Sequence, residues 1–108
     1  MVDFNRMPCI YWSDVTKISY LQRYIIVHSI IYYELNDSVI SDKKFDSTAR
    51  QLVKMQKRME RQKLKKTMYY YCMHDFDGST GFDLYDRLVP YDKEYLTKIA
   101  NSIVRQNS

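Results

Sequence analysis

Glycine and proline are scarce in this chain, with two of each among 108 residues. Both residue types interrupt regular structure and form tight turns, so a chain with few of them has few places to change direction. A β-sandwich needs a turn after every short strand and is therefore a poor expectation. Long helices joined by a few short connections are the better one.

Cysteine is equally rare. The two cysteines, Cys9 and Cys72, are far apart and form neither a CxxC motif nor a disulfide framework. This usage is typical of a reducing compartment, so we expect a cytoplasmic protein. No apolar run reaches the ~20 residues of a membrane-spanning helix. The opening residues, MVDFNRMPC, lack the basic and then apolar layout of a signal peptide. We therefore expect no membrane association.

What the chain does contain is typical of one folded domain, 1–108. Hydrophobic residues make up 45 % of it and charged residues 28 %, a balance that argues against disorder. The unusual feature is its eleven tyrosines. Tyrosine rings pack at the edges of cores, but they also stack on bases or nicotinamide rings and anchor protein interfaces.

After an N-terminal arm, 1–12, the pattern predicts a helix over about 14–35, capped by Ser13 or Asp14. Its apolar stripe follows helical spacing and includes Ile18, Leu21, Ile25, His28, Tyr32 and Leu35. Further apolar residues widen the stripe until little of the helix is polar. Such a helix must be covered on more than one side. It is either the central helix of the domain or a surface for self-association, and in the second case the protein is a homo-oligomer.

The polar turn Asn36-Asp37-Ser38 ends this helix, and Ser41 or Asp42 caps a second one over about 42–66. With so short a connection, the two helices should form an antiparallel hairpin. Residues 67–81 are ambiguous between a continued helix and an extended segment. A short helix over 82–88 and a last helix from Asp92 to about Arg105 complete an all-α fold.

The second helix carries a basic run from Lys54 to Lys66 that contains one acid, Glu60. The run is either a solvated helix face or a ridge that contacts nucleic-acid phosphates. The candidate contacts are Arg50, Lys54, Lys57, Arg58, Arg61 and Lys65. The acidic segment after His74 departs from a calcium loop at Thr80 and Asp86, so we predict no metal site.

Polar and aromatic side chains converge where the two predicted helices meet. His28 and Tyr32 lie one turn apart at the end of the first helix. Asp42 and Asp46 lie one turn apart at the start of the second, with Phe45 between them. In an antiparallel hairpin the two groups face each other. Aromatic faces beside carboxylates can hold a flat ring that offers hydrogen-bond donors or positive charge.

The run HSIIYYELNDSVISDKKFDSTARQL, within a hairpin segment over 20–52, resembles the small N-terminal helical domain (domain Ia) of NAD-dependent DNA ligases. That domain carries a pattern close to Y-[HY]-x6-I-[SP]-D-x2-[YF]-D, followed by Arg-x-Leu. The chain matches the pattern without a gap from Tyr32 through Asp42, Phe45 and Asp46 to Leu52. Small stand-alone domains of this kind are expected of phage or other mobile genomes.

The resemblance implies a binding role for the matched residues. In the ligases this domain holds the nicotinamide mononucleotide (NMN) half of NAD. By position, Tyr32 and Phe45 would contact the nicotinamide ring, and Asp42 and Asp46 would make polar contacts. Tyr33 stands where many ligases have His, and Phe45 where most have Tyr, so two polar groups are missing. No K-x-D-G nucleophile motif occurs in the chain, and we expect no catalysis by it.

Three functions follow from these patterns. The first is a non-catalytic protein-interaction module with the ligase domain fold, an inhibitor or decoy that acts on a host protein. The second is a module that binds NMN or NAD and acts in trans with a nucleotidyltransferase. The third is an accessory DNA-binding protein. The sequence favours the first. Tyr33 and Phe45 leave fewer polar contacts for a nucleotide, and a lone domain has no second domain to close over the ligand from the other side.

Overall fold

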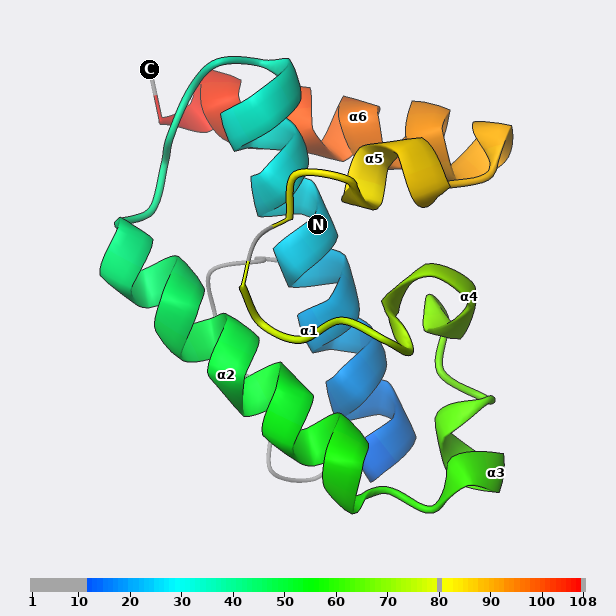
Figure 1. Ribbon diagram of the computed structural model, residues 1–108. Helices are drawn as coiled ribbons and strands as arrows, with labels where there is room; N and C mark the ends of the chain where they lie inside the picture. Colours follow the sequence, from blue (N-terminus) through cyan, green and yellow to red (C-terminus); the bar gives the residue numbers. More distant parts are fainter. Residues whose placement is uncertain (1–11, 80, 108) are drawn as a thin grey trace.

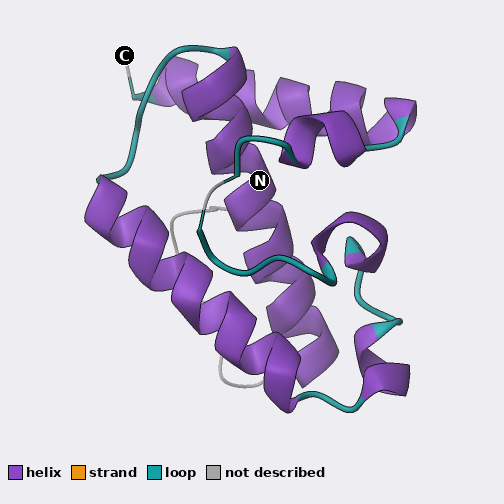
Figure 2. Ribbon diagram, viewed as in Figure 1, coloured by secondary structure: helices purple, strands orange, loops and turns teal. Residues whose placement is uncertain are grey.

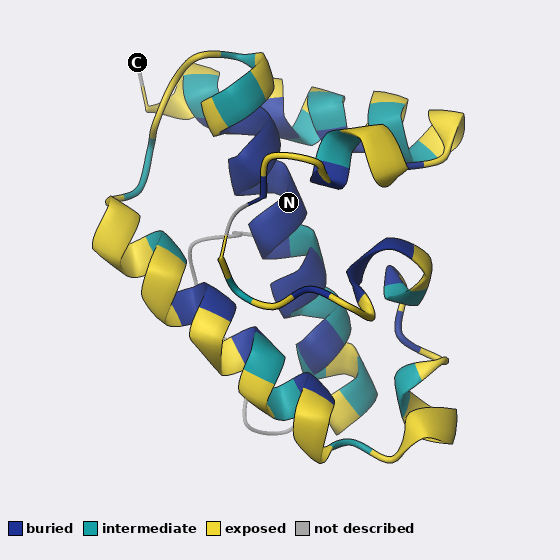
Figure 3. Cartoon of the chain, viewed as in Figure 1, coloured by how far each residue is buried: buried dark blue, intermediate teal, exposed yellow. Residues whose placement is uncertain are grey.

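The first helix forms the centre of the molecule. The computed structural model describes residues 12–79 and 81–107, so the predicted arm lies outside the described residues except for Trp12. Helix α1 (Asp14–Ser29) is capped by Ser13, whose hydroxyl accepts the backbone N–H of Thr16 at 3.2 Å. It continues directly into a π-helix, η1 (Ile30–Glu34). Residues 24–31 are all buried, and Figure 3 shows the middle of α1 enclosed by the other elements.

Helix α2 (Asp42–Arg58) returns in the opposite sense and packs diagonally across α1 (Figure 1). Ser41 caps it by accepting the backbone N–H of Lys44 at 3.0 Å. Its inward face contributes Ala49 and Leu52 to the core, whereas its outer face is exposed. Every described element is helical (Figure 2), so the predicted all-α fold with an antiparallel hairpin is confirmed.

The second helix ends earlier than the predicted boundary near residue 66. Met59 adopts extended backbone angles, φ −78° and ψ 139°, and breaks the helix. A single turn, α3 (Arg61–Leu64), follows, and α4 (Tyr70–Met73) is another short helix inside the segment that the sequence leaves ambiguous. The basic run is therefore divided between two helices.

Two helices complete the chain, α5 (Leu84–Arg87) and α6 (Pro90–Gln106), and both are shorter than the continuous run of α1 and η1. Helix α6 begins with Pro90, two residues before the predicted Asp92, because proline has no N–H to leave unpaired at a first helical position. Its buried residues include Leu96 and Ala100, and it packs against α1 and η1. The apolar surface of α1 is thus used within the domain.

A buried polar network joins α1 to α2 and to the segment after it. The Gln22 amide donates to the Gln56 side chain at 2.9 Å and to the Thr67 hydroxyl at 3.0 Å, and its oxygen accepts the backbone N–H of Tyr69 at 3.0 Å. Gln56 in turn donates to the Met73 carbonyl at 3.0 Å. Buried amides are stable only when their hydrogen bonds are satisfied, so this network fixes the three segments relative to one another.

The loop between α4 and α5 crosses over α1 (Figure 1). Arg87 holds its two ends through ion pairs to Asp75 at 2.6 Å and Asp83 at 3.1 Å. Gly81 lies directly on Ser29 of α1: a Cβ atom at Gly81 would lie 1.9 Å from the Ser29 hydroxyl oxygen. Only glycine permits this approach. The loop is therefore seated on α1 beside the start of η1.

Among the described residues, the helices fall short of the length and apolar character that a bilayer span requires.

Candidate functional site

A pocket of about 310 Å³ lies where α1 and η1 meet α2 and the α4–α5 loop. It is partly open to solvent. The connection between the helices supplies part of the lining, and the helix ends and the α4–α5 loop supply the rest. Its lining consists of His28, Ser29, Ile31, Tyr32, Tyr33, Ser38, Val39, Ile40, Ser41, Asp42, Phe45, Asp46 and Ser79.

All five residues predicted as cofactor contacts line this one pocket: Tyr32, Tyr33, Asp42, Phe45 and Asp46. The short connection explains the convergence, since it sets the start of α2 opposite the end of the first helix. The structure thereby brings the predicted residues together. What they bind stays a prediction.

The aromatic wall depends on η1. In this π-helix the backbone N–H of Leu35 bonds the Ile30 carbonyl at 3.0 Å, so its turn is one residue longer than an α-turn. Tyr32 and Tyr33 sit in that turn, with ring centroids 4.8 Å apart and planes at 79°. Phe82 from the α4–α5 loop extends the row, 5.5 Å from Tyr33 at 87°. π-Turns are frequent at functional sites, and this one carries both tyrosines of the pocket.

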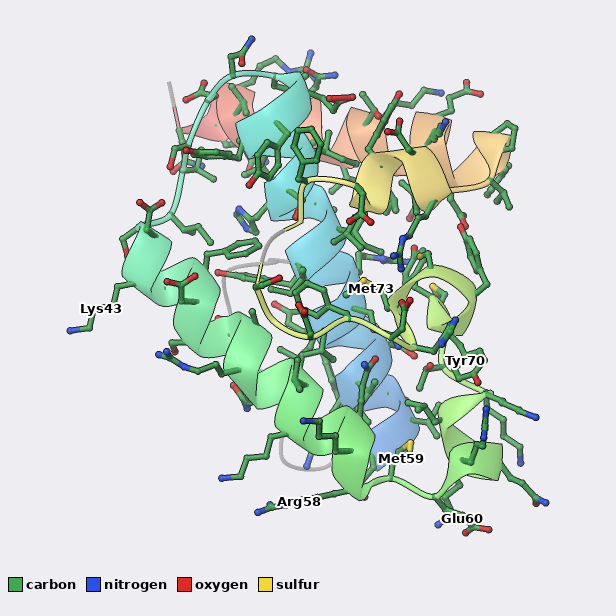
Figure 4. The ribbon with its side chains drawn as sticks, viewed as in Figure 1. Lys43, Arg58, Met59, Glu60, Tyr70 and Met73 are labelled. Carbon is green, nitrogen blue, oxygen red and sulfur yellow. The ribbon has the colours of Figure 1, made fainter. Side chains whose placement is uncertain are left out.

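The acidic side of the pocket comes from the first turns of α2. Asp42 and Asp46 are exposed at its rim, one helical turn apart. Neither is among the described residues that form ion pairs. Within the described chain no lysine or arginine lines the pocket, and Figure 4 shows Lys43 projecting from α2 away from α1. Both carboxylates are thus left to meet solvent or a ligand.

His28 is among the residues that line the pocket and is 3 % exposed. Neither ring nitrogen has a hydrogen-bond partner among the described residues. The imidazole contacts the Tyr24 ring, with ring centroids 4.4 Å apart and planes tilted by 48°. Burial lowers the pKa of His28 to about 4, so the ring is neutral at pH 7. A neutral imidazole offers one donor and one acceptor, and both are unused here.

Ser79 reaches the pocket from a distant part of the chain, and sequence reasoning missed it. Gly78, with φ +85°, allows the turn that directly precedes Ser79. The Asp77 carboxylate then accepts the Ser79 hydroxyl at 2.6 Å and its backbone N–H at 2.9 Å, which holds the pKa of Asp77 below its ordinary value. A D-G-S turn is readable in a sequence. The sequence does not show that this turn lies next to the pocket.

The six candidate nucleic-acid contacts are all exposed, and none of them is among the described residues that form an ion pair. Those on α2 share one stripe, from which Arg58 projects into solvent in Figure 4. Arg61 and Lys65 fall beyond the break at Met59, in and after α3. The structure therefore gives a four-residue basic stripe and a separate pair. Contact with DNA stays a prediction.

The described residues include no group of three or more histidine, cysteine or acidic side chains arranged to hold a metal ion. Searches of protein-family models, curated proteins and solved structures return no match to the chain. The resemblance to the ligase domain therefore rests on the residue pattern from Tyr32 to Leu52.

Proposed function

We propose that the protein is a non-catalytic module that binds nicotinamide nucleotides, NMN or the nicotinamide half of NAD. One observation carries the proposal: the five residues matched by position to the ligase pattern line a single pocket. A volume of about 310 Å³ is near the lower end for small-molecule sites, which suits a ring and its sugar better than a whole dinucleotide.

The pocket favours nucleotide binding over the protein-interaction module, which the sequence alone favours. The two substitutions that argue against nucleotide binding, Tyr33 and Phe45, still place aromatic rings on the pocket. The apolar surface of the first helix, which is the sequence evidence for an interaction module, is buried inside the domain. Ser79, which lies outside the matched pattern, adds a hydroxyl oxygen to the lining that can accept a hydrogen bond.

The proposal includes action in trans on a nucleotidyltransferase in the cytoplasm. The pocket is partly open to solvent; Tyr32 in its lining is 53 % exposed, and Phe82, which packs on the ring of Tyr33, is 71 % exposed. Exposed aromatic side chains in and next to a pocket suit a second protein surface that closes over the ligand. The chemistry would then belong to the partner, and this chain would position the nicotinamide half.

Calorimetric titration with NMN and with NAD tests the proposal. We expect both ligands to bind, and we expect Tyr32→Ala to weaken binding about tenfold through the loss of ring stacking. Tyr91→Ala is the matched control, because Tyr91 is 75 % exposed and stacks on Tyr95 outside the pocket. Absence of heat with either ligand at millimolar concentration would refute the proposal, as would equal losses in the two variants.

A further inference from the structure

The positive charge of the chain is concentrated in one segment. Residues 50–66 hold eight lysine and arginine side chains and one acid, Glu60, and so carry a net charge of +7. The whole chain carries +4, so the remaining residues are together net negative. All eight cationic side chains are exposed, and none is among the described residues that form an ion pair. Their charge is therefore available to a partner.

Four of these cations lie in one row on α2. With 3.6 residues and 5.4 Å per helical turn, they fall within an arc of about 100° and extend over about 12 Å of the helix axis. The buried residues Leu52 and Gln56 lie on the opposite side of the helix. Figure 3 shows the outer side of α2 exposed. We call this row the basic stripe, and it consists of Arg50, Lys54, Lys57 and Arg58.

Anionic partners differ in what they need besides positive charge. A helix that lies on a membrane inserts an apolar face, and a single-stranded nucleic acid stacks its bases on aromatic side chains. The apolar face of α2 is used in the core of the domain. None of the exposed large hydrophobic side chains of the described chain belongs to α2 or α3. The stripe offers charge alone, which suits the phosphate backbone of a duplex.

The shape of α2 favours a DNA duplex over an RNA duplex. Exposed residues recur in every turn of this helix. The major groove of B-DNA is about 12 Å wide and admits an α-helix, whereas the major groove of an RNA duplex is deep and narrow. Duplex RNA is recognised largely through its 2′-hydroxyl groups. Four cationic side chains on a protruding helix match phosphates that border a wide groove.

We infer that the outer side of α2 is a docking surface for duplex DNA, which the basic stripe binds through its phosphates and without reading the base sequence. The inference goes beyond the proposed function and does not depend on it. The stripe residues do not line the pocket, which lies at the other end of α2. A bound duplex would therefore leave the pocket lining free.

Fluorescence anisotropy with short labelled DNA duplexes of two unrelated sequences tests the inference. Four phosphate contacts predict a slope of about −3.6 for the logarithm of the association constant against the logarithm of the salt concentration. Affinity should then fall about a hundredfold between 50 and 200 mM salt. We expect the two sequences to bind equally. Single-stranded DNA of the same sequence, an RNA duplex and phosphatidylserine vesicles are the comparison ligands.

The double variant Lys54→Gln/Lys57→Gln removes two contacts and keeps side chains that suit an exposed helix. We expect its salt slope to fall to about −1.8. Lys93→Gln/Lys98→Gln is the matched control, because it removes the same charge from α6 and leaves the stripe intact. Its slope should stay near that of the wild-type protein. NMN binding should be unchanged in both variants, since neither pair lines the pocket.

Several outcomes would overturn the inference. One is a wild-type slope weaker than about −2, and another is an equal change of slope in the two variants. Tighter binding of single-stranded DNA or of the RNA duplex would assign the stripe to a different nucleic acid. Binding to the vesicles without binding to duplex DNA would assign it to a membrane surface. None of these results bears on NMN, so the proposed function is tested separately.

Discussion

At the residue scale, the side chain with the strongest physical signature is His28. A buried imidazole without hydrogen bonds is held neutral, because charging it would place an unpaired cation in a medium that solvates it poorly. In the unfolded chain the same group titrates near 6.5, whereas in the folded chain its pKa falls to about 4. The unfolded state therefore binds this proton first as the pH falls.

His28 therefore makes the folded protein more stable at neutral pH than at acidic pH. The contribution of His28 is fully present above pH 6.5 and is lost progressively as the pH falls from 6.5 through about 4. Between pH 7 and pH 5 the free energy of unfolding should drop by about 2 kcal/mol from this group. Urea unfolding at a series of pH values measures the drop, which should largely disappear in His28→Gln.

His74→Gln is the control for that experiment, because His74 is the exposed histidine of the chain. This variant should keep the wild-type pH dependence. An unchanged pH dependence in His28→Gln would show that His28 is protonated equally in the folded and unfolded states.

At the element scale, the pocket depends on the α4–α5 loop lying against α1. The contact of Gly81 with Ser29 sets the distance between them, and Ser29 is itself tied to the Ile25 carbonyl at 2.7 Å. Ser29 has little freedom to withdraw, since it is 3 % exposed and adjoins η1. A side chain at position 81 must therefore push the loop away from the helix.

Gly81→Ala should lower the free energy of unfolding by about 2 kcal/mol, as other overpacked contacts do. Alone, Ser29→Gly should lower the free energy of unfolding by about 1 kcal/mol, because glycine has a low helix propensity. Combined, the two changes should cost clearly less than their sum, because the second removes the atoms with which the first collides. Denaturant unfolding of the four proteins gives the coupling. Additive losses would show that the two residues do not touch.

At the scale of the whole molecule, the hairpin was predictable because its signals are local. Apolar spacing marks both helices, and two serines cap them at Ser13 and Ser41. The break at Met59 was not predictable, since no glycine or proline marks it. The π-turn at Ile30–Glu34 also leaves no mark in the residue pattern.

Some residues of the pocket could be predicted from the sequence, and others could not. Its helix-borne residues, such as Tyr32 and Asp42, were predictable because a short connection leaves two helix ends few relative positions. Ser79 was not, since it arrives through a contact between Gly81 and Ser29 that spans 52 positions of the chain. The neutral state of His28 was equally hidden, because it depends on which elements bury the ring. Contacts between remote segments, rather than periodicity, complete the site.

The most direct test of the central claim is to map where NMN binds on the isotopically labelled protein, from its backbone amide spectrum. We predict that NMN shifts signals from all the segments that form the pocket, including Ser29, Tyr33, Val39, Asp46 and Ser79. Signals from the far end of α2, such as Lys57, should stay in place. Shifts confined to other surfaces, or none at saturating ligand, would contradict the claim that this pocket binds a nicotinamide nucleotide.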